Sequence, residues 1–459
     1  MTKLTLKYFL TGAITLGLMS SCGEDRTGEY LALVGTQTWV YQTMQENYLY
    51  YEDLPAEDGL NFFTKPQQFI ASLVSSKDQK NGVKFTHLDS IYTQPASRAD
   101  GRPTFGMEGA IVRVPNGSEA IRVLYTQKDS PAEEAQLKRG DWIIAANGRK
   151  INSNSYANFI THPTEACSFT LGSFNGRGFD TLNVVQMPSP RIVKVNDLLE
   201  SHLVTSGSRK AAYLLYNEFG KDEELLKNTF GQLAGQAFDD IILDLRYNPG
   251  GYVTTSQVLA SNLAPAESVG QPFLKMTSND KLNKTEIYNI DAKLMGAGAP
   301  LSYQNLYVIT SGNTASASEI IINGLKPYMK GRLIQVGTPT FGKNVAQSRF
   351  FNEQTPQVEL WLTTFSLTNS EDFGDYFTNG LKPDFNIAED LAGKLGAFGT
   401  EQDSLMTPVF YHMANASFPG TKEEGEETDK DPESKVSRTN GIKVLYHSIA
   451  EKPKWLKAE

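Results

Sequence analysis

The sequence predicts a multidomain protein of the α/β class. Its 459 residues are enough for about three domains at roughly 150 residues each. From Lys210 onward, short apolar strands alternate with Gly-containing turns and helical segments, an order typical of an α/β core. Residues 101–190 instead show short strands separated by turns, which indicates a separate β domain. Apolar residues make up 40% of the chain, so it can bury sizeable cores.

The first 22 residues have the pattern of an export signal. Lys3 and Lys7 precede an apolar run over residues 9–19, which is too short for a bilayer span of about 20 residues. Met19-Ser20-Ser21-Cys22 resembles a bacterial lipobox. It implies a signal peptide over residues 1–21, lipidation of Cys22, and anchoring in the cell envelope, at the outer membrane on its periplasmic face or at the cell surface. The alternative is an ordinary signal with an incidental cysteine, in which case a Cys22–Cys167 disulfide is possible.

The composition argues against several classes of function. The formal net charge of −9 disfavours nucleic-acid binding, which normally requires a basic surface. The chain has only 2 Cys and 5 His, and the histidines have no metal-ligand spacing. Neither common nucleotide-binding glycine motif is present at the Gly-rich turns. We therefore expect no metal and no organic cofactor.

Four segments complete the predicted domain organisation. Residues 22–29 are expected to form a tether, and residues 30–95 a small helical domain with an aromatic stripe. The α/β core is expected over residues 191–395 and a C-terminal extension over residues 396–459. Residues 421–435 of this extension are acidic and lack large apolar side chains, which predicts a disordered linker.

Residues 101–190 resemble a PDZ domain, with a generic small β-barrel as the alternative. Two strands flank Asn116-Gly117, a typical hairpin turn, and the stretch Ser130–Ile151 matches the PDZ pattern of a capped short helix, a turn and a strand. PDZ domains bind an extended peptide as an added strand. The corresponding peptide-binding loop contains Phe105, Gly106 and Met107, whereas Glu108 would repel the carboxylate of a peptide terminus.

Two Gly-rich turns in the α/β region are expected to direct backbone N–H groups toward one place. Asn248-Pro249-Gly250-Gly251 follows the predicted strand 241–245, and residues 311–316 lead from the strand 306–310 into a helix. Glycine permits close approach to the backbone, and a helix N-terminus adds positive potential. Such a place suits the oxyanion of an acyl-transfer intermediate.

Lys343 lies in another Gly-flanked loop that follows the predicted strand 333–336. Burial there would disfavour the charged ammonium and lower its pKa, so that a neutral amine could accept a proton from a serine hydroxyl. Ser–Lys pairs are a known variant of the catalytic triad.

Four motifs together resemble the carboxyl-terminal processing, or tail-specific, serine peptidases. They are Asp244–Gly251, Thr314–Ile320, Thr340–Gln347 and Gly380–Phe385, and they lie downstream of the PDZ-like region in the order typical of that family. The resemblance implies a crotonase-like ββα peptidase core, preceded by a PDZ domain and a small helical N-terminal domain.

The resemblance also implies roles for individual residues. It assigns Ser316 as the nucleophile, Lys343 as the base and Gln347 as the residue that orients Lys343. The oxyanion donors fall on the backbone N–H groups of Ala317 and of the pair Gly250/Gly251. Ser318 is the alternative nucleophile, and Ser318 and Glu319 are otherwise expected to cap the helix or support the site.

The predicted function is that of a serine endopeptidase that cleaves extended or unfolded polypeptides. No nucleic acid is expected as a partner, and contact with the membrane is expected only through the lipid anchor. The sequence leaves two other functions open. One is a catalytically inactive scaffold that binds peptides, and the other is a hydrolase of non-peptide esters or amides.

Overall fold

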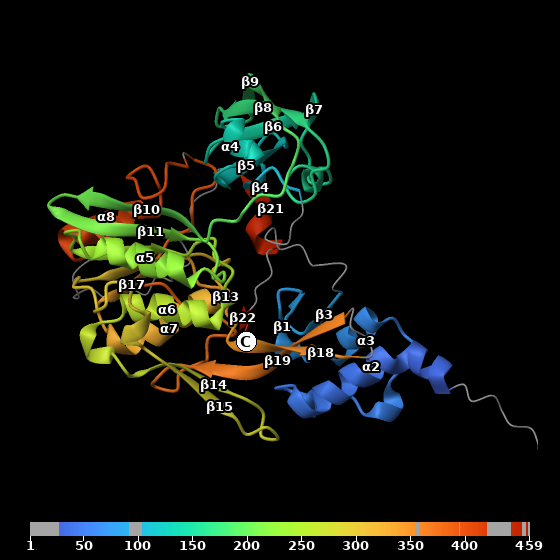
Figure 1. Ribbon diagram of the computed structural model, residues 1–459. Coiled ribbons are helices and arrows are strands. Elements are labelled where there is room, and N and C mark those ends of the chain that lie inside the picture. Colours follow the sequence, from blue (N-terminus) through green and yellow to red (C-terminus); the bar gives the residue numbers. More distant parts are fainter. Residues whose placement is uncertain are drawn as a thin grey trace, which may run out of the picture.

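The computed structural model describes residues 27–90, 103–353, 358–393, 395–419, 442–451 and 456–457. This part of the chain forms two large β-sheets with helices between them and a small β domain beside them (Figure 1). The predicted signal peptide, Cys22 and the acidic linker 421–435 lie outside the described residues.

The first large sheet, here called the central sheet, has the order β10-β11-β12-β16-β17-β20. β10 is antiparallel to β11, and the remaining neighbours are parallel. Parallel strands are covered on both faces, which explains why β12, β16 and β17 are buried along their whole length. The strands are β10 (Leu198–Ser206), β11 (Arg209–Tyr216), β12 (Asp240–Asp244), β16 (Leu306–Thr310), β17 (Leu333–Gly337) and β20 (Phe385–Asn386).

The second large sheet, here called the outer sheet, has the order β13-β22-β18-β19-β14-β15, and β3 also pairs with β19. Helices α6 and α7 share one apolar cluster with residues of both sheets, so the two helices lie between the sheets. The helix α5 buries Leu226, Phe230 and Leu233 in this cluster, as its period predicts. The strands are β13 (Gly251–Tyr252), β14 (Pro272–Thr277), β15 (Thr285–Asn289), β18 (Val345–Phe351), β19 (Val358–Thr368) and β22 (Leu456–Lys457). The helices are α5 (Glu223–Leu233), α6 (Val253–Leu263) and α7 (Ala317–Leu325).

The small β domain, residues 104–191, has a sheet of order β4-β5-β6-β8-β9 with β7 paired to β6. Strand β21 (Lys443–His447), from the C-terminal end of the chain, joins this sheet beside β4. A backbone bridge between Thr104 and Arg191 joins the two ends of the domain. The Ser130 hydroxyl accepts the N–H of Glu133 and so caps the short helix α4, as the sequence predicts. Its elements are β4 (Met107–Arg113), β5 (Glu119–Thr126), α4 (Pro131–Glu134), β6 (Trp142–Ala146), β7 (Arg149–Lys150), β8 (Cys167–Phe174) and β9 (Phe179–Met187).

The N-terminal region differs from the small helical domain predicted over residues 30–95. Helix α2 (Thr27–Asn47) begins within the predicted tether, and α3 (Pro66–Leu73) packs beside it. Strand β3 (His87–Ser90) joins the outer sheet, and the aromatic stripe buries against Leu360 and Leu362 of β19. The region is therefore continuous with the outer sheet, because its apolar face packs on β19. Strands β1 (Gln79–Lys80) and β2 (Val83–Lys84) form a separate hairpin.

The described part of the C-terminal extension, predicted over residues 396–459, packs against other parts of the molecule. Helix α8 (Met406–Asn415) buries Val409 and Met413 in an apolar cluster that it shares with the central sheet. Beyond the linker, β21 (Lys443–His447) pairs with β4 of the small β domain, and β22 pairs with β13 and β18 of the outer sheet. Figure 1 shows these last strands beside two different parts of the molecule.

Short 3-10 helices connect many of these elements. They cover Tyr51–Asp53, Glu57–Gly59, Ser76–Asp78, Tyr156–Asn158, Ala266–Ser268, Ala292–Leu294, Lys326–Tyr328 and Ser448–Glu451.

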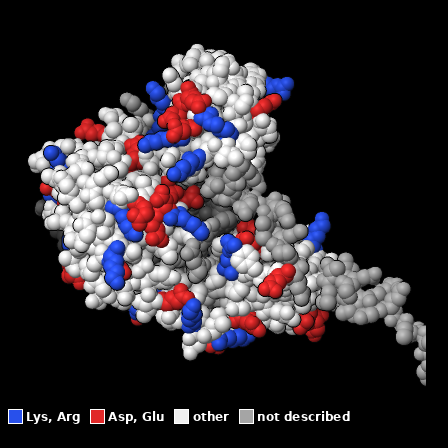
Figure 2. All heavy atoms as spheres, viewed as in Figure 1, with Lys and Arg blue, Asp and Glu red and all other residues white. Residues whose placement is uncertain are grey.

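Acidic and basic side chains are mixed over the face drawn in Figure 2, which has no large area of a single sign. The same view shows the surface hollowed between the small β domain and the body of the two sheets. Among the residues that the structure describes, no helix is both long enough and apolar enough to cross a bilayer.

Candidate active site

Ser316 lies at the turn between β16 and α7, immediately before the first residue of the helix. Its backbone has φ +60°, a left-handed conformation that is uncommon for residues other than glycine. The residue is fully buried, and its hydroxyl has no hydrogen-bond partner. Buried hydroxyls are normally satisfied, so an unpartnered one on strained backbone is typical of a functional position.

Glu319, one turn into α7, ties the Ser316 turn to the loop that carries Lys343. Its Oε2 accepts the N–H of Ser316 at 2.7 Å and the N–H of Lys343 at 2.8 Å. Its Oε1 accepts the Gly342 N–H at 2.5 Å and the Thr340 hydroxyl at 2.6 Å. One carboxylate therefore fixes the backbones of two segments that are far apart in the sequence. Burial raises the pKa of Glu319 to about 7, against the effect of these four donors.

The Lys343 side chain is fully buried between the outer sheet and the N-terminal region. Its Nζ donates to Gln347 Oε1 at 2.6 Å, and the amide nitrogen of Gln347 donates to the carbonyl of Phe85. The same Nζ lies 4.9 Å from the centre of the Phe85 ring. Gln347 is part of β18, so the sheet sets its position and thereby the direction of the lysine side chain.

Asp78 is a further buried charge near this lysine, and nothing in the local sequence indicates it. Its carboxylate accepts the hydroxyls of Tyr48 at 3.0 Å and Thr363 at 2.5 Å. Burial raises its pKa to about 6, while hydrogen bonds and the charge of Lys343 oppose the shift. The N-terminal region thus contributes Asp78 and Phe85 to the surroundings of Lys343, a contribution that sequence analysis missed.

The predicted oxyanion donors are unequal in their contacts. The Gly250 N–H donates to Asn248 Oδ1 at 2.9 Å, so it is already committed within its own turn. Gly251 has φ +145°, and a Cβ there would lie 2.1 Å from the carbonyl oxygen of Phe219, so only glycine fits. Ala317 is the first residue of α7, where helix N–H groups have no acceptor within the helix. Gly251 lies opposite Leu456 of β22, so the role of Gly251 and Ala317 as oxyanion donors stays a prediction.

The two Gly-rich turns are joined through the backbone carbonyl of Asn248. It accepts the N–H of Ala315 at 3.1 Å and the hydroxyl of Ser318 at 3.2 Å. Ser318 is therefore occupied as a structural link, in contrast to Ser316. The Asn248 side chain donates to the carbonyl of Tyr216 at 2.9 Å and holds the turn against β11.

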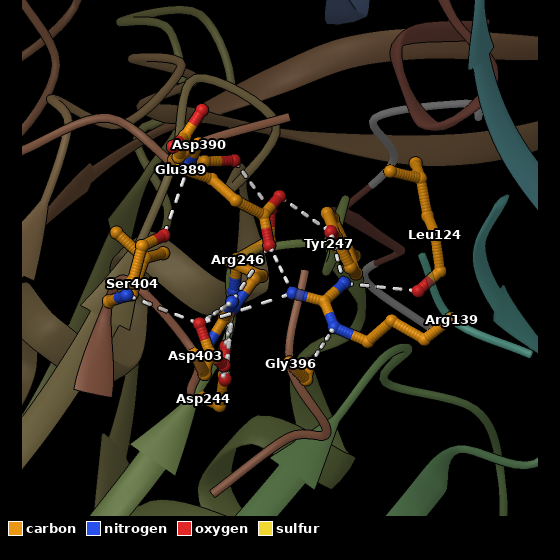
Figure 3. Close-up of polar contacts among 12 residues, drawn as sticks. Leu124, Arg139, Asp244, Arg246, Tyr247, Glu389, Asp390, Gly396, Asp403 and Ser404 are labelled. Carbon is orange, nitrogen blue, oxygen red and sulfur yellow. Dashed lines mark hydrogen bonds and ion pairs between the residues drawn. The ribbon is translucent and has the colours of Figure 1, made fainter. Parts of the chain in front are cut away.

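A buried ion cluster, here called the Arg246 cluster, underlies the same turn (Figure 3). Arg246 is fully buried and forms ion pairs with Asp244 at 2.6 Å, Asp403 at 2.7 Å and Glu389 at 2.8 Å. Arg139 of the small β domain also pairs with Glu389, at 2.6 Å. Burial alone would raise the pKa of Glu389, but the two arginines lower it to about 2. The cluster joins the small β domain to the central sheet.

The predicted peptide-binding loop of the small β domain is mostly committed to its own fold. The side chains of Phe105 and Met107 are buried in the apolar core of the domain. The Gly106 N–H donates to the Thr104 hydroxyl at 3.1 Å. The edge of β4 that follows the loop is paired with β21.

Cys167 is buried as a free thiol, and the described residues contain no group of three or more potential metal ligands.

Two parts of the chain match peptidase family models, and the chain has peptidase relatives. Residues 210–387 match the model of "Peptidase family S41", and residues 35–86 match that of "Peptidase S41 N-terminal domain". The chain is 27% identical over 359 residues to the carboxyl-terminal-processing protease of Picosynechococcus, an alignment that covers 75% of this chain and 81% of that protein. It is 25% identical to the carboxy-terminal processing protease CtpB of Bacillus subtilis, covering 56% of this chain and 51% of that one.

A solved structure shares the fold of most of the chain. An S41 protease from Bacteroides fragilis superposes with a TM-score of 0.73 at 28% sequence identity, covering 83% of this chain and 97% of that one.

Proposed function

The chain belongs to peptidase family S41, a family of serine peptidases, and from this premise we propose that it is an endopeptidase with a Ser316–Lys343 dyad. One observation carries the proposal. The carboxylate of Glu319 accepts the backbone N–H groups of Ser316 and Lys343 through the same oxygen atom, while the Ser316 hydroxyl stays unpartnered. A nucleophile and its base must be held close together, and Glu319 supplies that constraint.

In the proposed mechanism, Ser316 Oγ attacks the carbonyl carbon of a peptide bond. The neutral amine of Lys343 takes the hydroxyl proton and then delivers it to the leaving amine. Burial of the side chain disfavours a charged ammonium. Gln347 Oε1 accepts a hydrogen bond from the same nitrogen and so directs it. The N–H groups of Gly251 and Ala317 stabilise the negative charge of the tetrahedral intermediate. Water then hydrolyses the acyl-enzyme.

Ser316 is preferred over Ser318 as the nucleophile. The Ser318 hydroxyl already donates to the Asn248 carbonyl, and its loss would loosen the contact between the two turns. Ser316 instead precedes α7, where the helix N-terminus favours a developing negative charge.

The substrate is proposed to be an extended polypeptide. The small β domain supports this, because the edge of β4 that pairs with β21 would accept a peptide strand once β21 is displaced, as in a PDZ domain. Lipidation of Cys22 is proposed from the lipobox alone, and it would tether the enzyme to the cell envelope.

The experiment is covalent labelling of the intact protein with a serine-reactive phosphonate, followed by peptide mapping and a parallel assay with casein, an unfolded substrate. We expect the label on Ser316, no label and no cleavage in Ser316→Ala, and both retained in Ser318→Ala. Lys343→Arg should also fail, because arginine does not release its proton. Peptide binding without label or cleavage would contradict the proposal and favour a scaffold.

A further inference from the structure

The C-terminal tail occupies the edge of the small β domain at which an added peptide strand would bind. β21 pairs antiparallel with β4, with Val444 opposite Val112 and His447 opposite Ala110. The tail therefore runs toward the beginning of β4, where the loop of Phe105 and Gly106 lies. An extended ligand added to this edge would form the same backbone hydrogen bonds.

Side chains anchor the tail as well as its backbone. The Tyr446 ring stacks on Tyr156, with 3.9 Å between the ring centres, and Leu445 packs on the core of the domain. The Ser448 hydroxyl donates to the buried carboxylate of Glu108 and accepts the Gly109 N–H at 3.0 Å. Glu108 would repel a terminal carboxylate, but it is suited to accept a hydrogen bond from the hydroxyl of a serine or threonine inside a peptide.

Farther along, the same tail reaches the candidate active site. Strand β22 pairs with β13, placing Leu456 opposite Gly251, and with β18, placing Lys457 opposite Gln347. Gly251 carries a proposed oxyanion donor, and Gln347 orients the proposed base. The backbone of residues 456–457 thus lies between the two strands that border the dyad, as Figure 1 shows for β13, β22 and β18.

We propose that the described parts of the tail, residues 442–451 and 456–457, act as an intramolecular pseudosubstrate, the first at the docking edge and the second at the candidate active site, until a polypeptide displaces them. This rests on the proposed peptidase function. Because the tail is tethered, it competes at a high effective concentration, and only segments that match its contacts displace it readily. The favoured ligand is an extended peptide with an aromatic residue two positions before a serine or threonine, in the places of Tyr446 and Ser448.

The first test weakens the tail in the full-length protein. Ser448→Ala removes a hydrogen bond to a buried carboxylate, so we expect casein cleavage and Ser316 labelling to rise about tenfold. Val184→Ala is the control on β9, the opposite edge of the same sheet, since the Val184 side chain is 55% exposed, and it should leave both rates unchanged. A synthetic peptide of residues 442–451 should inhibit the Ser448→Ala variant more strongly than the same peptide with alanine at the tyrosine position.

The second test locks the tail in place. Arg113 and Lys443 are paired residues with exposed side chains, so a double variant Arg113→Cys/Lys443→Cys can form a disulfide across β4 and β21. We expect the oxidised form to cleave casein at least about tenfold more slowly than the reduced form. Each single cysteine variant should be insensitive to the reductant.

The outcomes separate the two proposals. Equal rates in the locked, released and original proteins, with Ser316 still labelled, would overturn the pseudosubstrate but keep the peptidase. Absence of label in every form would overturn the peptidase. Intact-mass measurement adds a third outcome. If the original protein loses its tail and Ser316→Ala retains it, the tail is a substrate, and the pseudosubstrate proposal fails.

Discussion

Two clusters of buried polar groups lie on either side of the Asn248–Gly251 turn, and they differ in how completely they are paired. In the Arg246 cluster, Arg246 meets three carboxylates and Tyr247 donates to Glu389. At the dyad, Glu319 is equally saturated, but the Ser316 hydroxyl has no partner. The comparison indicates that complete pairing holds the scaffold in place, whereas the unpartnered Ser316 hydroxyl is where substrate is expected to bind.

The largest expected effect is on the reaction. Lys343→Met replaces the buried amine with an apolar side chain of similar length, so casein cleavage should fall by a factor on the order of 10⁴, as for loss of a triad residue. The free energy of unfolding should fall by about 2 kcal/mol, because the hydrogen bond to Gln347, the interaction with Asp78 and the contact with the Phe85 ring are each modest contributions. Cleavage rates and denaturant unfolding measure the two effects. A stability loss as large as that expected for Arg246→Met would remove the contrast between the two clusters.

The opposite pattern is expected in the other cluster. Arg246→Met leaves three carboxylates facing one another in a buried site, which should cost about 4 kcal/mol of unfolding free energy. Denaturant unfolding measures this cost. The matched control is Arg209→Met, which breaks a partly exposed pair with Asp240 and should cost about 1 kcal/mol. Similar losses of unfolding free energy in the two variants would show that burial is not the cause of the high cost in the Arg246 cluster.

Two buried carboxyl groups beside the proposed dyad should also impose a pH dependence on stability. The pKa of Glu319 is raised by burial from 4.5 to about 7, so its neutral form is favoured in the folded state. Its stabilising contribution is present below pH 4.5 and is lost as the pH rises through 7, a change of roughly 3 kcal/mol. Asp78, with its pKa raised to about 6, acts in the same direction.

Denaturant unfolding between pH 4.5 and 8 tests this slope. Glu319→Gln cannot titrate, so its stability should vary less with pH than that of the original protein, whatever its absolute value. Asp78→Asn provides a second comparison if Glu319→Gln does not fold. Parallel pH profiles in all three proteins would show that neither carboxyl group is responsible.

The smallest effect is expected for Ser318→Ala. The variant loses one hydrogen bond to the Asn248 carbonyl, which should cost about 1 kcal/mol of unfolding free energy. Cleavage of casein should remain within about tenfold of the original rate, since the carbonyl still accepts the Ala315 N–H. Complete loss of cleavage with a normal unfolding curve would reverse the assignment of Ser316.

Local patterns in the chain predicted much of this fold correctly. The sequence showed the continuous apolar runs of β12, β16 and β17 and the helical spacing of apolar residues in α5. Both patterns arise because buried positions of a strand or helix require apolar residues. The motifs that contain Ser316 and Lys343 were identified by their resemblance to a peptidase family, which is possible because each motif is a short continuous segment.

Contacts between distant segments leave no such local record, and only the tertiary structure decided them. Nothing near Asp78 or Phe85 indicates that they lie beside Lys343, because their neighbours come from a sheet formed much later in the chain. The tail is a similar case, since its few apolar residues are compatible with many docking sites. The sequence by itself determined which residues have the chemistry for catalysis. The folded chain decided which hydroxyl stays unpartnered, which carboxylate links the two loops and where the tail lies, because each depends on the positions of several elements at once.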